Sequence, residues 1–194
     1  MNQRRREAGL PGNCAEFRDL AVFSDDASRR RVTEILRQVR PEVVLTASPV
    51  DYMCDHEATS ALVRDACFGA PAPNYRSGAP DAALPIPAIP HLYFVDAVGG
   101  VDRENRRIVP DFYVDVGRFF ETKKCMLAEH KSQRDWLRQH HGMDDYLEMM
   151  ERFTRQNGAF AGVEFAEGFR QYKGHPYPES PLLQELLGAA AITA

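Results

Sequence analysis

The feature that most constrains the fold is a β-branched run, Glu42–Ala47, placed between two stretches with helical spacing. The run shows no polar alternation until its end, which is typical of a strand covered on both faces, as in a parallel sheet. Apolar residues within 27–40 recur at helical spacing, with arginines on the opposite side. A strand is also expected over 16–23. The order strand, helix, strand, helix favours an α/β fold with a doubly wound sheet.

The ends of these elements carry their own signals. Ser24, Asp25 and Asp26 form a capping signal for the first helix, and Arg40-Pro41 ends it. The segment from Gly69 to Pro90 holds six prolines and two glycines, so we expect a long surface loop without regular structure. Loops of this length are uncommon unless they are functional, and we expect this one to contribute to substrate specificity.

The second half of the chain predicts further elements by pattern. They are strands over His91–Asp96 and Asp111–Val116, a helix over about 117–140, a helix from Asp144 to Asn157-Gly158, an apolar segment over Val163–Phe169 and a helix near 181–187. The buried stripe of the 117–140 helix is expected to hold Phe119, Phe120, Met126, Leu127, Trp136 and Leu137. We also expect the segment 163–175 to contribute to specificity. The sequence shows no repeat and no domain boundary, so residues 1–194 are expected to form one domain.

Composition excludes several classes of protein. The chain has 24 Lys and Arg against 28 Asp and Glu, a net charge of −4, which argues against a nucleic-acid binder. The mean hydropathy is −0.43 and no apolar run reaches membrane-spanning length. The basic N-terminus lacks the apolar stretch of a secretory signal, so a cytoplasmic location is expected. The four cysteines show no metal or disulfide spacing, and we expect Cys67 and Cys125 to pack internally.

Candidate chemistry follows the run at 42–47, because ligands of open α/β sheets bind beyond the carboxyl ends of strands. The next loop holds Asp51, Asp55 and His56, which can supply a metal ligand and a carboxylate behind it, although a histidine at a helix start also serves as a cap. Each of the other candidates has a structural alternative: Asp25-Asp26 (N-cap), His130 (solvated helix face), His140-His141 (helix end) and His175 (turn).

Four motifs then occur in the order found in one known family. They are Arg40-Pro-Glu-Val-Val-Leu-Thr; Asp51-Tyr52-x-x-Asp55-His56-x-x-Thr59; Lys123 with His130, Ser132 and Gln133; and Gly162-Val163-x-x-Ala166-Glu167-x-Phe169. Together they resemble the PIG-L (LmbE-like) deacetylase family, from about Cys14 to the C-terminus. The resemblance implies a Rossmann-like, mostly parallel sheet that holds one Zn²⁺. It also implies hydrolysis of an N-acetyl or N-acyl group on a small glucosamine-type molecule.

Residue roles come from the same resemblance. It makes His56 a zinc ligand and Asp55 the catalytic carboxylate behind it, with His130 as a second catalytic group. It implies substrate contacts for Arg4, Tyr52, Glu167 and Arg170. The chemistry is consistent, because zinc polarises an amide carbonyl and lowers the pKa of its bound water toward about 7. Such a site uses about three protein ligands and one open position.

Two departures from the family pattern are clear. The A-H-P-D-D-E block after the first strand is missing, and Phe23-Ser24-Asp25-Asp26 lies too close to the 42–47 run to replace it. We therefore expect the first βαβ unit to be missing. Met53-Cys54 stands where many members have His-Pro. A single ligand does not hold catalytic zinc, so the chain is expected to be inactive alone unless a partner completes the site.

Two hypotheses follow. One is an incomplete zinc-dependent deacetylase. The other is a non-catalytic binding or interaction module derived from that family. In both cases the missing strand leaves a sheet edge open, and we expect self-association, with a homo-oligomer as one form.

Overall fold

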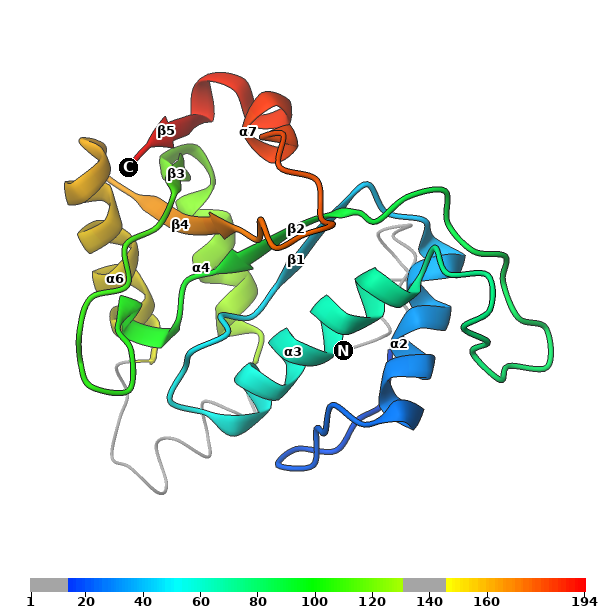
Figure 1. The fold of residues 1–194 in the computed structure, drawn as a ribbon. Coiled ribbons are helices and arrows are strands. Elements are labelled where there is room, and N and C mark those ends of the chain that lie inside the picture. The colour runs from blue at the N-terminus through cyan, green and yellow to red at the C-terminus, as the bar shows by residue number, and fades with distance from the viewer. Residues whose placement is uncertain (1–13, 131–145) are drawn as a thin grey trace.

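The computed structural model describes residues 14–130 and 146–194, which form a mixed α/β structure around a five-stranded open sheet (Figure 1). In chain order the elements are α2 (Asp26–Val39), β1 (Val43–Thr46), α3 (Cys54–Gly69), β2 (His91–Val95), η1 (Val98–Gly100), β3 (Phe112–Asp115), η2 (Gly117–Phe119), α4 (Phe120–Ala128), α6 (Tyr146–Ala161), β4 (Ala166–Gln171), α7 (Leu182–Leu187), η3 (Gly188–Ala190) and β5 (Ala191–Thr193).

The sheet order is β1-β2-β4-β3-β5. β1 and β2 pair in parallel, with Val43 opposite His91, and the α3 crossover connects them. The pairs β2–β4, β3–β4 and β3–β5 are all antiparallel. The prediction of a mostly parallel sheet is therefore wrong for the described residues. β1, β2 and β3 do run in one direction, but β4 inserts between β2 and β3 in the opposite direction, and hydrophobic periodicity carries no information about such an insertion.

Helix α3 packs against one face of β1 and β2, and α2 packs beside α3 (Figure 1) with its Leu36 in the same core. Leu92 and Phe94 of β2 point into this core, where Ala66 and Cys67 of α3 meet them. Alternate residues along the strands, Tyr93 among them, form a second core with Phe112 and Phe169 on the other face. Cys67 is buried as predicted, whereas Cys125 is exposed.

The predicted strand over 16–23 is wrong. Glu16 and Leu20 have φ values of 53° and 58°, which interrupt any extended segment. Leu20 is also 67% exposed, so this segment does not bury the apolar side chains that suggested a strand. Its backbone is fixed by a side chain instead, since the Asp55 carboxylate accepts the N–H groups of Leu20 at 2.6 Å and Val22 at 3.4 Å.

The prediction for α2 is confirmed at both ends. The Asp25 carboxylate caps the helix by accepting the Ser28 N–H at 2.7 Å, and this bond lowers the pKa of Asp25. Arg40 ends the helix in the left-handed conformation. The following strand β1 lies at the sheet edge, and its Leu45 is 51% exposed. The expected cover on both faces is therefore wrong at Leu45.

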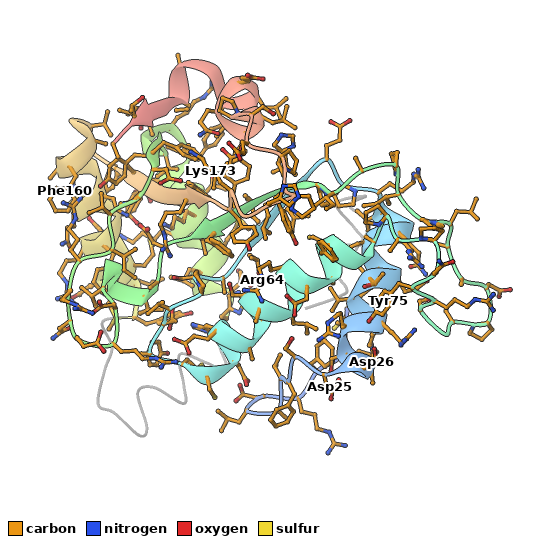
Figure 2. All side chains as sticks on the ribbon, in the orientation of Figure 1. Asp25, Asp26, Arg64, Tyr75, Phe160 and Lys173 are labelled. Atoms are coloured by element: carbon orange, nitrogen blue, oxygen red, sulfur yellow. The ribbon has the colours of Figure 1, made fainter. Side chains whose placement is uncertain are left out.

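The segment over 69–90 contains no helix or strand, as predicted, and it lies against α2 (Figure 2). The Tyr75 hydroxyl donates to the Asp26 carboxylate at 3.4 Å, and the Ala83 N–H donates to Glu34 at 2.9 Å. The segment leaves α3 at Gly69, the opposite end of that helix from His56. This placement does not support the expected contribution to specificity near His56.

Two helix boundaries differ from the predictions. α4 ends at Ala128, short of the expected 140, and residues 131–145, including His140 and His141, lie outside the described residues. α6 continues past Asn157-Gly158 to Ala161. A Cβ on Gly158 would lie 2.5 Å from the Glu164 carbonyl oxygen, so this glycine allows a close backbone approach and does not mark a helix end. Among the described residues no helix is long and apolar enough to cross a membrane.

Candidate functional site

The loop after β1 centres on a buried carboxylate, that of Asp51, which is 3% exposed. Its Oδ1 lies 3.0 Å from Nδ1 of His56 and accepts the Met53 N–H at 3.2 Å. Its Oδ2 accepts the backbone N–H of Val98, in the segment after β2, at 3.1 Å. These bonds fix the orientation of the His56 ring. Because Asp51 contacts Nδ1, Nε2 is the nitrogen left to bind a metal ion or a substrate.

A second carboxylate, that of Glu57, connects the loop after β1 to the segment after β2. Glu57 accepts the Asp51 N–H at 2.8 Å and pairs with Arg103, whose Nε lies 3.0 Å from its Oε1. The backbone N–H of Asp51 and then the Arg103 guanidinium hold the pKa of Glu57 below its ordinary value. The residues around His56 are thereby fastened to the segment after β2.

Tyr52 and Asp55 lie on different sides of this loop. Tyr52 is 75% exposed and presents its ring edge-on to His56, with 5.8 Å between centroids. Asp55 is buried and accepts the two backbone N–H groups of the 14–25 segment. The geometry thus gives the contact with His56 to Asp51, which the resemblance had placed at Asp55.

Arg170 projects from β4 toward the same strand ends. It lies opposite Phe94 in the sheet, and its Nη2 donates to the Ser48 hydroxyl at 2.8 Å. Burial lowers the pKa of Arg170, and the charges of Asp96 and Asp111 oppose that shift. Within the described chain, neither its Nε nor the hydroxyl of Thr46 has a hydrogen-bond partner, although both atoms are buried. Arg170 therefore retains donor capacity beside the loop that carries His56.

The remaining predicted residues are placed as follows. Glu167 forms a 2.7 Å ion pair with Lys123 of α4, which brings the third and fourth motifs of the resemblance together. His130 is exposed beyond the end of α4, and its N–H donates to the Leu127 carbonyl at 3.1 Å. Arg4 lies outside the described residues.

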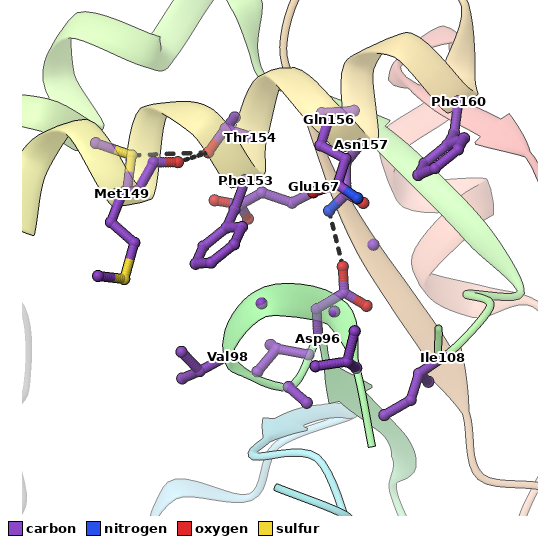
Figure 3. Close-up of a pocket in the computed structure, with 18 of the residues that line it drawn as sticks. Asp96, Val98, Ile108, Met149, Phe153, Thr154, Gln156, Asn157, Phe160 and Glu167 are labelled. Carbon is purple, nitrogen blue, oxygen red and sulfur yellow. Dashed lines mark hydrogen bonds between the residues drawn. The ribbon is translucent and has the colours of Figure 1, made fainter. Parts of the chain in front are cut away.

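A cavity of about 460 Å³ lies between α6, the segment 96–108 and β4 (Figure 3). Its wall includes Val98, whose backbone N–H is bonded to Asp51 of the loop after β1. Asp96, at the end of β2, accepts a hydrogen bond from the Asn157 amide at 2.8 Å, and burial raises the pKa of its carboxyl group. Sequence reasoning did not select Asp96 or Asn157. The signal for Asp96 was its position after a strand, whereas Asn157 was interpreted only as a helix end.

The residues present fit a zinc ion in part. Among residues 14–130 and 146–194, no group of three His, Cys, Asp or Glu side chains is arranged to hold a metal ion. His56, with its Nδ1 on the Asp51 carboxylate, has the arrangement common to zinc-binding histidines. It supplies one ligand, where a catalytic zinc site needs about three.

Comparison with known proteins gives a fold. No family model matches the chain. Similar solved structures include the conserved protein TT1542 from Thermus thermophilus, with a TM-score of 0.66 and 24% identity over 91% of this chain and 72% of that one. N,N'-diacetylchitobiose deacetylase from Pyrococcus horikoshii matches with a TM-score of 0.61 and 21% sequence identity, over 92% of this chain and 64% of the deacetylase. GalB, the 4-carboxy-2-hydroxymuconate hydratase from Pseudomonas putida, matches with a TM-score of 0.58 and 22% sequence identity, over 80% of this chain and 60% of the hydratase.

At these identities the likeness shows a shared fold. The chain spans between 60% and 72% of the length of these neighbours. Because one neighbour is a deacetylase and another a hydratase, the fold alone does not select a reaction.

Proposed function

We propose that the chain is a zinc-dependent hydrolase of the PIG-L type that removes an N-acetyl or N-acyl group from a glucosamine-type molecule. The chain supplies only part of the zinc site from its described residues, and a partner such as a second copy of the chain completes that site. The observation that carries the proposal is the 3.0 Å contact of His56 Nδ1 with buried Asp51 in the loop after β1. Ligands of open α/β sheets bind at such strand ends. The motifs around Asp51 and Glu167 and the likeness to a deacetylase support the same reaction class.

The chain's own residues take distinct parts in this proposal. Asp51 holds the His56 ring through Nδ1 and leaves Nε2 as the nitrogen for a ligand. Tyr52 lies beside the ring at the surface, where a sugar ring can stack. Arg170, held by Ser48, offers a donor toward a substrate oxygen. Zinc bound at His56 would polarise the amide carbonyl and supply a water of lowered pKa, and its other ligands would come from outside the described residues.

One observation favours the alternative, a non-catalytic binding or interaction module. The described residues include no group of three metal ligands, while hydrogen bonds of Asp51 to Glu57 and to Val98 still hold the loop in place. Such a module would keep the pocket without hydrolysis. The two hypotheses differ in whether an amide is cleaved, whatever the chain binds.

The test is an assay of amine release. Purified protein is incubated with N,N'-diacetylchitobiose or N-acetylglucosamine, with added Zn²⁺ or with a chelator, and free amine and acetate are quantified. We expect metal-dependent release in stoichiometric amounts, and its loss in His56→Ala, with Phe119→Ala on the exposed surface as the control. A folded, zinc-loaded protein that releases no amine would support the binding module instead.

A further inference from the structure

The cavity between α6, the segment 96–108 and β4 is walled mainly by apolar side chains, and most of its polar groups are bonded to one another. Lys123 forms an ion pair with Glu167 and donates to Thr154 at 3.0 Å. The Asp96 carboxylate accepts a hydrogen bond from the Asn157 amide (Figure 3). The apolar part of the wall consists of Val98, Val101, Ile108, Met149, Met150, Phe153 and Phe160 among others. Oδ1 of Asp96 is buried and has no hydrogen-bond partner among the described residues, so the cavity offers this polar acceptor within a mainly apolar wall.

The cavity shares its supports with His56. Asp51 binds His56 through one carboxylate oxygen and the backbone of Val98, a wall residue, through the other. A molecule whose reacting group lies at His56 can therefore extend its remaining part into the cavity.

We propose, resting on the proposed function, that this cavity holds an apolar group of the substrate. The preferred substrate is then an amphipathic N-acyl compound that carries an alkyl or aromatic group, and a bare N-acetyl sugar binds more weakly. A volume of about 460 Å³ lies within the range of small-molecule sites, which are typically apolar with a few placed polar groups. The apolar group is either the acyl chain itself or a substituent on the sugar, and both would fill the same wall.

Binding measured without turnover tests this inference. N-octanoylglucosamine and octyl N-acetyl-β-glucosaminide, each below its critical micelle concentration, are compared with N-acetylglucosamine by calorimetry in the presence of a chelator. We expect at least one of the two eight-carbon compounds to bind at least tenfold more tightly than N-acetylglucosamine. Tighter binding of the octanoyl compound would identify the apolar group as the acyl chain, and tighter binding of the octyl glycoside would identify it as a substituent on the sugar. Phe153→Asp should abolish this gain, whereas Phe119→Asp, at an exposed position outside the wall, should keep it.

A second variant protects the test against misfolding. Val98 is 45% exposed at the cavity wall, so Val98→Trp narrows the cavity without disturbing a core position. Val98→Trp should also remove the tighter binding of the eight-carbon compounds relative to N-acetylglucosamine. Equal binding of all three compounds, or a gain that survives in folded Val98→Trp, would overturn the inference. Because the chelator prevents metal-dependent turnover, the binding result does not depend on the outcome of the hydrolysis assay. Zinc-dependent cleavage without tighter binding of the eight-carbon compounds would reject the role of the cavity and leave the proposed hydrolysis standing.

Discussion

Nδ1 of His56 lies 3.0 Å from the buried carboxylate of Asp51, which also accepts the backbone N–H of Val98 at 3.1 Å. One carboxylate thus orients the candidate metal ligand and joins it to the segment that walls the cavity. The sequence places Asp55 directly beside His56, but the helix geometry of α3 turns Asp55 toward Leu20.

Asp51→Asn tests this division of roles. An amide keeps the shape but loses the charge that supports the His56 ring, and changes of this kind typically lower metal affinity about 10–100-fold. We expect that loss in chelator-competition titrations with zinc. Asp55→Asn is the matched control: it should lower the melting temperature by weakening the tie to Leu20 and leave zinc affinity nearly unchanged. Equal losses of affinity in both variants would contradict the assignment.

The Glu57 pair predicts a pH dependence with a definite sign. The pKa of Glu57 in the folded state is lowered from 4.5. Its contribution to stability is therefore fully present above the pKa of the unfolded state and is lost as the pH falls through the pKa of the folded state. We expect the melting-temperature difference between wild type and Glu57→Gln to be full at neutral pH. It should shrink as the pH falls below 4.5. Glu179→Gln, at an exposed carboxylate, should show no such trend; a difference that grows in acid would refute the account.

The open edge at β1 predicts self-association. β1 pairs only with β2 among the described strands, its sequence VVLT has no charge or proline to protect the edge, and Leu45 is half exposed. Leu45→Lys should shift the species in sedimentation velocity toward smaller sizes across a concentration series. Leu84→Lys changes another exposed leucine, in the 69–90 segment, and should have no effect. A wild-type monomer at all concentrations would count against this prediction.

Gly158 predicts a helix position where alanine is harmful. Alanine has the higher helix propensity, but its Cβ would meet the backbone of Glu164 at 2.5 Å. We expect Gly158→Ala to lower the free energy of unfolding by about 1–3 kcal/mol in urea denaturation, the range typical of overpacking. The reverse exchange next to it, Ala159→Gly on the exposed face, should cost about 0.5–1 kcal/mol through propensity alone. A more stable Gly158→Ala protein would show that α6 and the segment after it separate easily.

The elements that were predicted correctly are those with local signals. The Asp25 cap, the end at Arg40 and the helix at α7 each depend on neighbouring residues, and the sequence contains those neighbours. The strand over 16–23 failed because its backbone is bonded to Asp55, more than thirty residues away. The prediction of a mostly parallel sheet failed for the same reason, since pairing between distant strands leaves no periodic pattern in the sequence.

For the candidate site, the sequence predicted the position of the loop but not the arrangement of its side chains. The loop with Asp51 and His56 could be located, because it follows a strongly patterned strand. Which carboxylate faces His56 depends on the rotation of α3, and the cavity depends on the packing of α6 against β4. Neither arrangement can be deduced from spacing along the chain. The ion pair between Lys123 and Glu167 likewise joins residues that are adjacent only in the fold.

The central claim, that His56 binds catalytic zinc, is tested most directly by the zinc content of the purified 194-residue protein beside His56→Ala. Elemental analysis after dialysis gives moles of zinc per mole of chain, and circular dichroism confirms that both proteins are folded. The account predicts about one zinc per chain in the wild type, as in a mononuclear catalytic site, and its loss in the variant. A folded wild type without zinc, or equal zinc in both proteins, would contradict it.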